Sequence, residues 1–291
     1  MRPHKAITVC IPTVSRPADL AVALASILGQ TVRPHRVLVI CDGPPEQAAS
    51  IKANGLIENI RTALEAERID VDFVTNPGPH GIGQAKNYYL GLVASEWFLQ
   101  LEDDAWLSPD YIERLTLTPS FNRASTAGIA GIQLLPTLPQ RAGWSDHDLS
   151  PQKTTPAIFN ELRITRSHVE YLNKGQVYRY SPEALRGRKE FPAQCFLHTY
   201  MLRTQAVEQV GGWDLRFSDV FRSFAFEEVD ATYNLWMGGY NLYVVPSAVM
   251  WHFRSDNRCL TWRYDAEKVR EGYEHNERLF IQKWRGRKRN P

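Results

Sequence analysis

The first hundred residues alternate between short apolar runs and helical patterns, and this alternation limits the folds open to the chain. The runs are rich in β-branched or aromatic residues: Ile7–Ile11, Val37–Cys41, Val71–Thr75 and Trp97–Leu101. A helix with Pro17 in its first turn and apolar residues at helical spacing is expected after the first run, and another after Gly83. Repetition of strand, helix and strand predicts an α/β fold with a parallel sheet covered by helices on both faces.

Size and charge are consistent with such a fold. The chain has 291 residues and a formal net charge of +2. Residues 254–291 hold eleven basic and six acidic side chains, so the rest of the chain is mildly acidic. The four cysteines are widely spaced and predict neither a disulfide framework nor a zinc site. No leader or membrane-spanning run is recognised, which predicts a cytoplasmic protein, with peripheral membrane contact through the basic end left open.

Polar residues follow each predicted strand where it ends, and in parallel sheets ligands bind beyond the carboxyl ends of the strands. These segments are Pro12–Arg16, Asp42–Gly43, Asn76 and Glu102–Asp104. The acidic triplet could hold Mg²⁺ or Mn²⁺, because both cations accept oxygen ligands, and the cation could then clamp a diphosphate. Alone, an acidic triplet is more typical of a solvated turn, and Asp42–Gly43 is equally typical of a plain turn.

A glycine-containing helix start adds to this picture. His80–Asn87 places Gly81 and Gly83 before or within the first turn of a helix that also carries Lys86. A helix N-terminus with a lysine suits phosphate or nucleotide contact, although glycines also serve ordinary turns.

The motifs together resemble the ordered signature of family 2 glycosyltransferases of the GT-A fold. The segments that carry the resemblance are Ile7–Thr13, Val39–Gly43, Gly81–Asn87 and Leu101–Tyr111, followed by Gly211–Asp214, Phe226–Asp230, Gly239–Tyr240, Val245–Pro246 and His252. The resemblance implies a Rossmann-like three-layer sandwich with a mainly parallel central sheet and a C-terminal acceptor-side extension. It also implies transfer of a sugar from a nucleotide diphosphate donor to an acceptor hydroxyl, with Mn²⁺ or Mg²⁺ and usually with inversion.

The resemblance assigns donor-side roles residue by residue. The residues implied to contact the nucleotide are Pro12, Thr13, Val14, Arg16, Asp42, Gly83, Lys86 and Asp103. Lys86 replaces the usual arginine and loses its bidentate fork. Asp104 is the implied principal metal ligand, His252 closes the metal site, and Glu102, in place of the family's first aspartate, is the atypical member.

The transfer also needs a general base near the acceptor and away from the metal. Glu227 and Glu228 begin a predicted helix at the position of the family's acidic pair, where the alternative role is to complement the helix dipole. The resemblance makes Glu228 the first choice for the base and Glu227 the second, with Asp230 expected to be structural.

The expected organisation is a nucleotide-sugar-binding half over residues 1–115, an acceptor-binding half over 116–255 and a basic helical tail over 256–291. Arg254 and Arg258 could reach the diphosphate, and the aromatic-containing stretch 136–192 is expected to shape the acceptor site. The end of the tail, Lys283–Arg289, is expected to be a solvated, frayed terminus more readily than a polyanion contact.

Three functions stay open at this point. The first is a glycosyltransferase that uses a nucleotide-sugar donor, with a UDP sugar favoured, and acts on a saccharide, a lipid-linked glycan or a small molecule. The second transfers sugar to hydroxymethylated bases in DNA, and the basic tail would then bind nucleic acid. The third is a non-catalytic nucleotide-binding protein on the same scaffold.

Overall fold

A computed structural model describes residues 6–134, 190–219, 226–253 and 266–290. The elements in chain order are β1 (Ile7–Thr13), α1 (Pro17–Leu28), β2 (Arg36–Cys41), α2 (Pro45–Lys52), α3 (Gly55–Ala66), β3 (Asp70–Thr75), α4 (Ile82–Leu90), β4 (Trp97–Gln100), β5 (Ala105–Leu107), α5 (Tyr111–Thr116), the 3-10 helix η1 (Pro119–Asn122), β6 (Thr126–Leu134), β7 (Phe191–Ala193), β8 (Tyr200–Arg203), α7 (Thr204–Gln209), α8 (Arg216–Asp219), α9 (Glu227–Met237), β9 (Asn241–His252) and α11 (Ala266–Trp284). The four predicted strands form, and so do the helices predicted after the first run, near Gly83 and from Glu227.

The described strands join one mixed sheet in the order β3-β2-β1-β4-β8-β6-β9-β5, with β7 on β9. The first four strands of this order are mutually parallel, as predicted. Strand β8 then runs antiparallel to both β4 and β6, and β6 runs parallel to β9. The carboxyl ends of β1, β2, β3 and β4 therefore lie at one edge of the sheet, which is where the predicted site residues follow.

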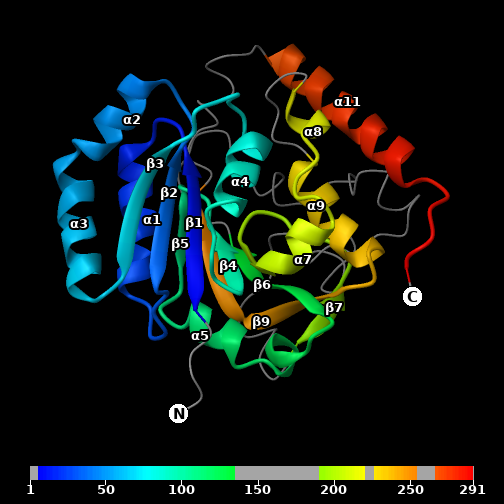
Figure 1. Ribbon diagram of the computed structural model, residues 1–291, viewed down its shortest axis with the longest axis horizontal. Helices are drawn as coiled ribbons and strands as arrows, with labels where there is room; N and C mark the ends of the chain where they lie inside the picture. The colour runs from blue at the N-terminus through cyan, green and yellow to red at the C-terminus, as the bar shows by residue number, and fades with distance from the viewer. Residues whose placement is uncertain (1–5, 135–189, 220–225, 254–265, 291) are drawn as a thin grey trace, which may run out of the picture.

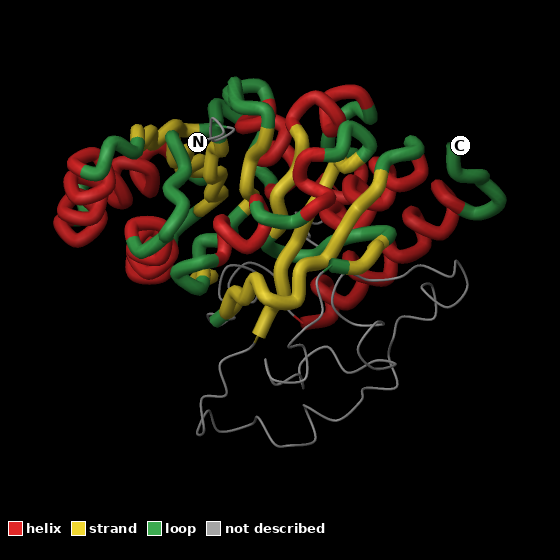
Figure 2. The backbone as a smooth tube through the Cα atoms, turned by 90° about the horizontal axis from the view of Figure 1, so that it is seen from below, coloured by secondary structure: helices red, strands yellow, loops and turns green. Residues whose placement is uncertain are grey.

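Two apolar cores lie on opposite faces of the sheet because strand side chains alternate between faces. On β2, Val37 and Val39 join the core under α1 and α3, whereas Leu38 and Ile40 join the core under α4, α7 and α9. Figure 1 shows α1, α2 and α3 on one side of the strands and α4, α7 and α9 on the other. The protein is thus a three-layer α/β sandwich, and Figure 2 shows its strands between flanking helices.

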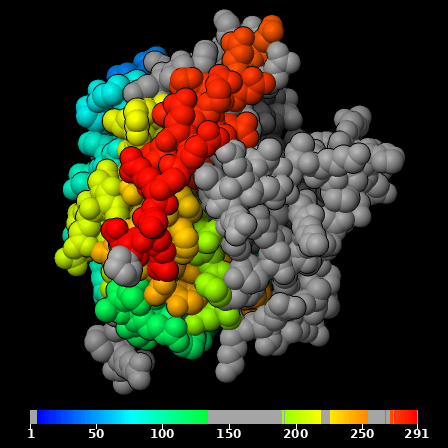
Figure 3. Space-filling model, turned by 90° about the vertical axis from the view of Figure 1, so that its right-hand side faces the viewer, coloured from blue at the N-terminus to red at the C-terminus, as the bar shows by residue number. Residues whose placement is uncertain are grey.

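The C-terminal helix corrects one expectation. Figure 3 shows α11 lying along the surface of the molecule, and its apolar face packs on α9. Phe280 and Trp284 are buried, and the indole Nε1 of Trp284 donates to Asp230 Oδ1 at 2.7 Å. The expected frayed terminus is therefore wrong as far as Trp284, because burial of two large aromatic side chains holds the helix in place. The residues from Arg285 to Asn290 are exposed, and among them Arg289 still donates to main-chain carbonyls of Trp236, Gly239 and Tyr240.

None of the helices among the described residues combines the length and the apolar character needed to cross a bilayer.

Candidate active site

The acidic triplet follows β4, and side chains from the segment at the end of β1 bind two of its carboxylates. The Arg16 guanidinium donates to Asp104 Oδ2 at 2.7 Å and also contacts Asp103 Oδ1, and the Thr13 hydroxyl donates to Asp103 Oδ2 at 2.7 Å. Asp103 and Asp104 are both buried. Arg16, predicted on the nucleotide side, therefore lies against Asp104, the predicted metal ligand, and Thr13 holds Asp103, which was predicted on the nucleotide side as well.

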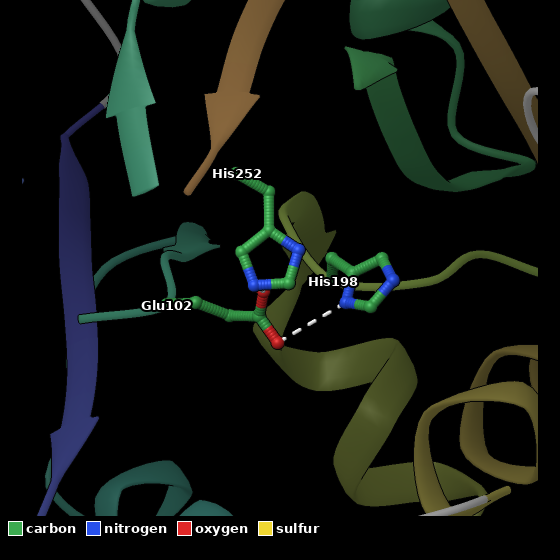
Figure 4. Close-up of side chains that lie close together, drawn as sticks. All are labelled: Glu102, His198 and His252. Carbon is green, nitrogen blue, oxygen red and sulfur yellow. Dashed lines mark hydrogen bonds and ion pairs between the residues drawn. The ribbon is translucent and has the colours of Figure 1, made fainter. Parts of the chain in front are cut away.

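The third carboxylate of the triplet lies between two imidazoles. Glu102 Oε1 is 3.2 Å from His198 Nδ1, and Glu102 Oε2 is 3.2 Å from His252 Nε2. His252 Nε2 is also 3.1 Å from Asp104 Oδ1. Figure 4 shows the Glu102 carboxylate facing both rings, which come from the end of β9 and from the loop before β8. Three chain segments therefore bring potential ligand atoms to one point.

These side chains fit a divalent cation. One ligand atom from each of Glu102, His198 and His252 lies within 4.8 Å of the others. Glu102 Oε2 is buried, and among the described residues it accepts no hydrogen bond of acceptable geometry. Carboxylate oxygen and imidazole nitrogen are both good ligands for first-row divalent ions. Asp104 Oδ1 is close enough to His252 to join them, so the geometry can hold a cation between Glu102, His198, His252 and Asp104.

Behind His252, the amide group of Gln133 contacts the ring nitrogen Nδ1 and so bears on which nitrogen carries the ring proton. His252 Nδ1 lies 2.9 Å from Gln133 Nε2 on β6, whereas Gln133 Oε1 is buried without a hydrogen-bond partner among the described residues. With this amide orientation Nδ1 accepts, and the proton sits on Nε2, which faces Asp104. A metal ligand must instead have a bare Nε2 and a protonated Nδ1. Turning the Gln133 amide over would supply Oε1 as the acceptor for that proton.

The surroundings lower the pKa values of Glu102 and Asp104 and raise that of Asp103. Burial raises the pKa of Glu102, but the neighbouring imidazoles of His252 and His198 outweigh it and hold that pKa well below its usual range. Burial likewise acts to raise the pKa of Asp104, but its hydrogen bond to His252 opposes burial, and the pKa lies below its usual value. At Asp103 burial dominates over Arg16, and together with the adjacent Asp104 charge it raises the pKa to about 7. Glu102 and Asp104 thus stay ionised, as cation ligands must.

The predicted acid pair starts α9, as expected, and encloses a buried lysine. Lys86 Nζ lies 2.7 Å from Glu228 Oε1 and 3.3 Å from Glu227 Oε1. All three side chains are buried, and Lys86 is only 1% exposed. The other oxygen of Glu228, Oε2, accepts the main-chain N–H of His198 at 2.6 Å. The predicted contact of Lys86 with the nucleotide stays a prediction, and in the structure its ammonium contacts the acid pair.

The buried cluster of Lys86, Glu227 and Glu228 contains one ammonium group and two carboxyl groups. Desolvation opposes the charge on Lys86, but Glu228 and Glu227 outweigh it and raise the lysine pKa. Burial, together with the charge of Glu228, raises the pKa of Glu227 to about 8, against the opposing effect of Lys86. Near neutral pH Glu227 therefore keeps its proton and Lys86 its charge. Of the two carboxyl groups, that of Glu228 is the closer to the ammonium.

Asp42 is also buried at the predicted edge, but its described partners lie in the segment between β3 and α4. Its Oδ1 accepts from Asn76 Nδ2 at 2.7 Å and lies 3.3 Å from His80 Nδ1, and its Oδ2 accepts from Gly81 N at 2.8 Å. Burial raises the pKa of Asp42 and these bonds oppose the shift. The side chain therefore fixes the turn that leads into α4, and its predicted contact with a base or ribose stays a prediction.

Gly83 has a packing reason for being glycine. A Cβ on it would lie 2.4 Å from Ser218 Oγ of α8, to which its main-chain N–H donates at 3.1 Å. Pro12 is buried at the end of β1, and the partly exposed Val14 follows it toward Arg16. Their predicted roles in the base pocket, like that of Gly83 at the nucleotide, stay predictions.

Sequence reasoning missed two residues of the site, His198 and Gln133. His198 precedes β8 in a segment without a motif, and its backbone is left-handed, with φ 66. Gln133 reaches His252 because β6 pairs with β9 far along the chain. The only available signal for His198 was a histidine directly before an apolar strand. Arg254, Arg258 and the greater part of 136–192 lie outside the described residues.

Comparisons with known proteins identify the family and the fold of the chain. The family model described as "Glycosyltransferase like family 2" matches residues 3–274. A search of curated proteins finds no match. Among solved structures, a mannosyltransferase from Pyrobaculum calidifontis in complex with GDP-Man and Mn²⁺ is similar, with a TM-score of 0.53 and 14% identity over 90% of this chain and 61% of its own. The structure of GalNAc-T7 with UDP, GalNAc and Mn²⁺ has a TM-score of 0.61 and 14% identity over 98% of this chain and 49% of its own. The chain thus spans about half to three fifths of these two proteins, and the likeness shows their common fold.

Proposed function

The chain belongs to glycosyltransferase family 2, and we propose that it moves a sugar from a nucleoside diphosphate donor to an acceptor hydroxyl in a reaction that requires a divalent cation. The preferred donor is a UDP sugar, and the acceptor is a saccharide, a lipid-linked glycan or a small molecule. The observation that carries the proposal is the cluster of Glu102, His198 and His252 beside the buried Glu228. His198 contacts the proposed cation ligand Glu102 through its ring and the proposed base Glu228 through its main-chain N–H.

The residues at the end of β4 bind the donor in this proposal. Glu102, His198, His252 and Asp104 hold the cation, which when bound offsets the charge that develops on the departing diphosphate. Arg16 and Thr13 keep Asp103 and Asp104 in place. Asp42, through Asn76 and Gly81, keeps the start of α4 next to the nucleotide.

Glu228 takes the proton of the acceptor hydroxyl. A general base must be ionised before the reaction, and the pKa of about 8 keeps Glu227 protonated near neutral pH. Glu228 is fixed by Lys86 and by the main-chain N–H of His198, so its carboxylate does not have to be ordered during the reaction. The acceptor oxygen then attacks the anomeric carbon opposite the diphosphate, which inverts the configuration.

The buried position of Trp284 bears on the DNA alternative. Its ring is 4% exposed and packs against α9, so it offers no face for stacking on a nucleobase. A nucleic acid acceptor would have to be recognised elsewhere, and we therefore keep a sugar or small-molecule acceptor as the proposed one.

A donor screen tests the proposal. UDP, GDP and TDP sugars are incubated with the protein and Mn²⁺ or Mg²⁺, and release of the nucleoside diphosphate is measured with and without a chelator. We expect one sugar nucleotide to be turned over, and the chelator to abolish that turnover. Glu228→Gln should lower it, whereas exchange of the exposed Glu208 for Gln should not. Turnover that persists after all metal is removed would refute the cation-dependent reaction.

A further inference from the structure

A residue with a left-handed backbone stands directly before the acid pair of α9. Phe226 has φ 75, and its main-chain carbonyl accepts the first helical hydrogen bond, from Asp230 N at 2.8 Å. A bulky residue seldom adopts this conformation, so the contacts around it must hold it there. Because Glu227 and Glu228 follow at once, the conformation of Phe226 sets the direction in which the first turn of α9 presents its two carboxyl groups.

The Phe226 ring packs against the C-terminal helix. Its centroid lies 5.6 Å from that of Phe280 on α11, and Phe280 is fully buried. Phe280 also contacts the ring of Tyr233 within α9, with centroids 5.7 Å apart. Figure 1 shows α11 lying beside α8 and α9. One aromatic side chain of α11 therefore contacts both the residue before α9 and the helix itself.

A second contact ties the first turn of α9 to the same helix. Asp230 is 1% exposed, and its two carboxylate oxygens have separate partners. Oδ1 accepts from the Trp284 indole at 2.7 Å, and Oδ2 lies 2.7 Å from Lys283 Nζ. Burying a carboxylate is costly unless it is paired and hydrogen-bonded, so Asp230 favours the docked position of α11. The acid pair thus lies between Phe226 and Asp230, and both of these residues contact α11.

Lys283 also reaches the segment that supports α4. Its ammonium lies 2.9 Å from Asp214 Oδ2. The neighbouring Trp213 is bound at both main-chain polar groups by Asn87 of α4, whose amide accepts from Trp213 N and donates to Trp213 O, each at 2.8 Å. Helix α4 carries Lys86, the counterion of the acid pair. Helix α11 therefore contacts the supports of both helices that form the buried ion pair.

We propose that α11 positions the base Glu228. Phe280 holds Phe226 in its left-handed conformation, and Asp230 anchors the first turn of α9 to α11. The Glu228 carboxylate is thereby kept where it receives the proton of the acceptor. Phe280 is a positioning residue, because it acts through Phe226 and not by contact with the reacting groups. The inference rests on the proposed function, since that function gives Glu228 the role of base.

Phe280→Leu is the most informative variant, because it keeps an apolar side chain on α11 and removes the ring that contacts Phe226. Phe226→Gly removes the same contact from the other side, and glycine adopts a left-handed backbone readily. Phe121→Leu is the matched control. Phe121 is also buried and stacks on another ring, with its centroid 5.0 Å from that of Trp97, but Trp97 begins β4, at the opposite end from the acidic triplet.

The main-chain amide of His198 reports the position of the base, because it donates to Glu228 Oε2 at 2.6 Å. Labelling with ¹⁵N-histidine gives one amide signal for each of the eight histidines, and His198→Asn identifies the signal required. We expect this amide proton signal to move upfield in Phe280→Leu, as the short hydrogen bond to the carboxylate lengthens, and to stay in place in Phe121→Leu.

Turnover of the donor found in the screen is measured on the same proteins, at a temperature where all are folded. We expect Phe280→Leu to lower kcat about tenfold or more, with the donor KM and the Mn²⁺ affinity within about twofold, because a displaced reacting group slows the chemical step. In the Phe226→Gly background, Phe280→Leu should lower kcat less than about twofold further, since the contact is already lost. Phe121→Leu should leave turnover unchanged.

Lys283→Met tests the second contact and replaces Phe280→Leu if that variant does not fold. The Lys283 side chain is 12% exposed, so its loss disturbs the aromatic core less. We expect the same upfield movement of the His198 amide signal and the same fall in kcat, each smaller than in Phe280→Leu.

The outcomes separate this inference from the proposed function. If Phe280→Leu and Lys283→Met leave the His198 amide signal or kcat unchanged, α11 does not position the base, although glycosyl transfer can still hold. Equal losses of turnover in Phe280→Leu and Phe121→Leu would also refute the inference, because the effect would then be general destabilisation. If wild type turns over no donor, the proposed function fails. A His198 signal that moves in Phe280→Leu would then still support α11 as the element that fixes Glu228, and an unmoved signal would refute it.

Discussion

The two carboxylate groups of the site are balanced by different kinds of partner. The triplet that follows β4 faces two imidazoles and Arg16, whose side chain is 27% exposed. The pair that begins α9 encloses Lys86, whose side chain is 1% exposed. An imidazole can bind a cation or a proton, whereas a buried lysine between carboxylates stays charged. In the proposed function the triplet therefore exchanges these partners for an ion, whereas the pair keeps Lys86 as its counterion.

The largest effect should come from removing the built-in counterion. Lys86→Met would leave Glu228 without its ammonium partner inside the protein. Breaking a buried ion pair on one side typically costs about 3–5 kcal/mol. We expect a loss of that order in the free energy of unfolding, measured by urea denaturation.

Lys52→Met is the control for this variant, because Lys52 is exposed at the end of α2. Its effect should stay within about 0.5 kcal/mol. A similarly small effect of Lys86→Met would mean that the acid pair does not depend on the lysine.

Glu227→Gln tests the charge state of the pair. The pKa of Glu227 is raised from 4.5 to about 8, so between these values the folded protein holds a proton that the unfolded chain has lost. The stabilisation is complete below about pH 4.5 and is lost as the pH rises through about 8. The free energy of unfolding of wild type should therefore fall more steeply from pH 5 to pH 9 than that of Glu227→Gln, which cannot titrate.

The measurement is urea denaturation across this pH range. Asp103 and Asp230 also have raised pKa values, of about 7 and about 6, but they are present in both proteins. The difference between the two curves therefore reports on Glu227. Parallel curves would show that Glu227 is ionised in the folded protein at neutral pH.

Gln133→Leu should have the smallest effect, confined to the cation side. It removes the amide that would hold the His252 ring through Nδ1. Loss of such an outer partner typically lowers metal affinity by about 10–100-fold. We expect weaker binding of Mn²⁺ by titration and little change in the pH dependence that Glu227 sets. Unchanged affinity would show that His252 is oriented without Gln133.

The parallel half of the fold could be predicted because its signals are local. The runs that form β1, β2, β3 and β4 are apolar, and Pro17 and Gly83 mark the helices between or beside them. The other half could not be read in the same way. Strand β6 pairs with β9 across a long separation in sequence, and the residues of one strand do not identify the other as its partner.

The site was predictable to the same degree. Glu102–Asp104 and Glu227–Glu228 stand directly after a strand and at a helix start, positions that sequence patterns reveal. Their partners depend on the three-dimensional path of the chain. Lys86 points to the acid pair because α4 packs near α9, and His198 joins the triplet because its backbone is left-handed. Neither arrangement has a sequence signal of its own.

The most direct test of the account compares Glu102→Gln with Glu228→Gln in two assays, Mn²⁺ affinity and turnover of the donor found in the screen. We predict that Glu102→Gln loses both, and that Glu228→Gln keeps its Mn²⁺ affinity while its turnover falls by about 10²–10⁴-fold, as expected for loss of a general base. If Glu228→Gln bound Mn²⁺ as poorly as Glu102→Gln, or turned over the donor as fast as wild type, the proposed division between a cation site and a base would be contradicted.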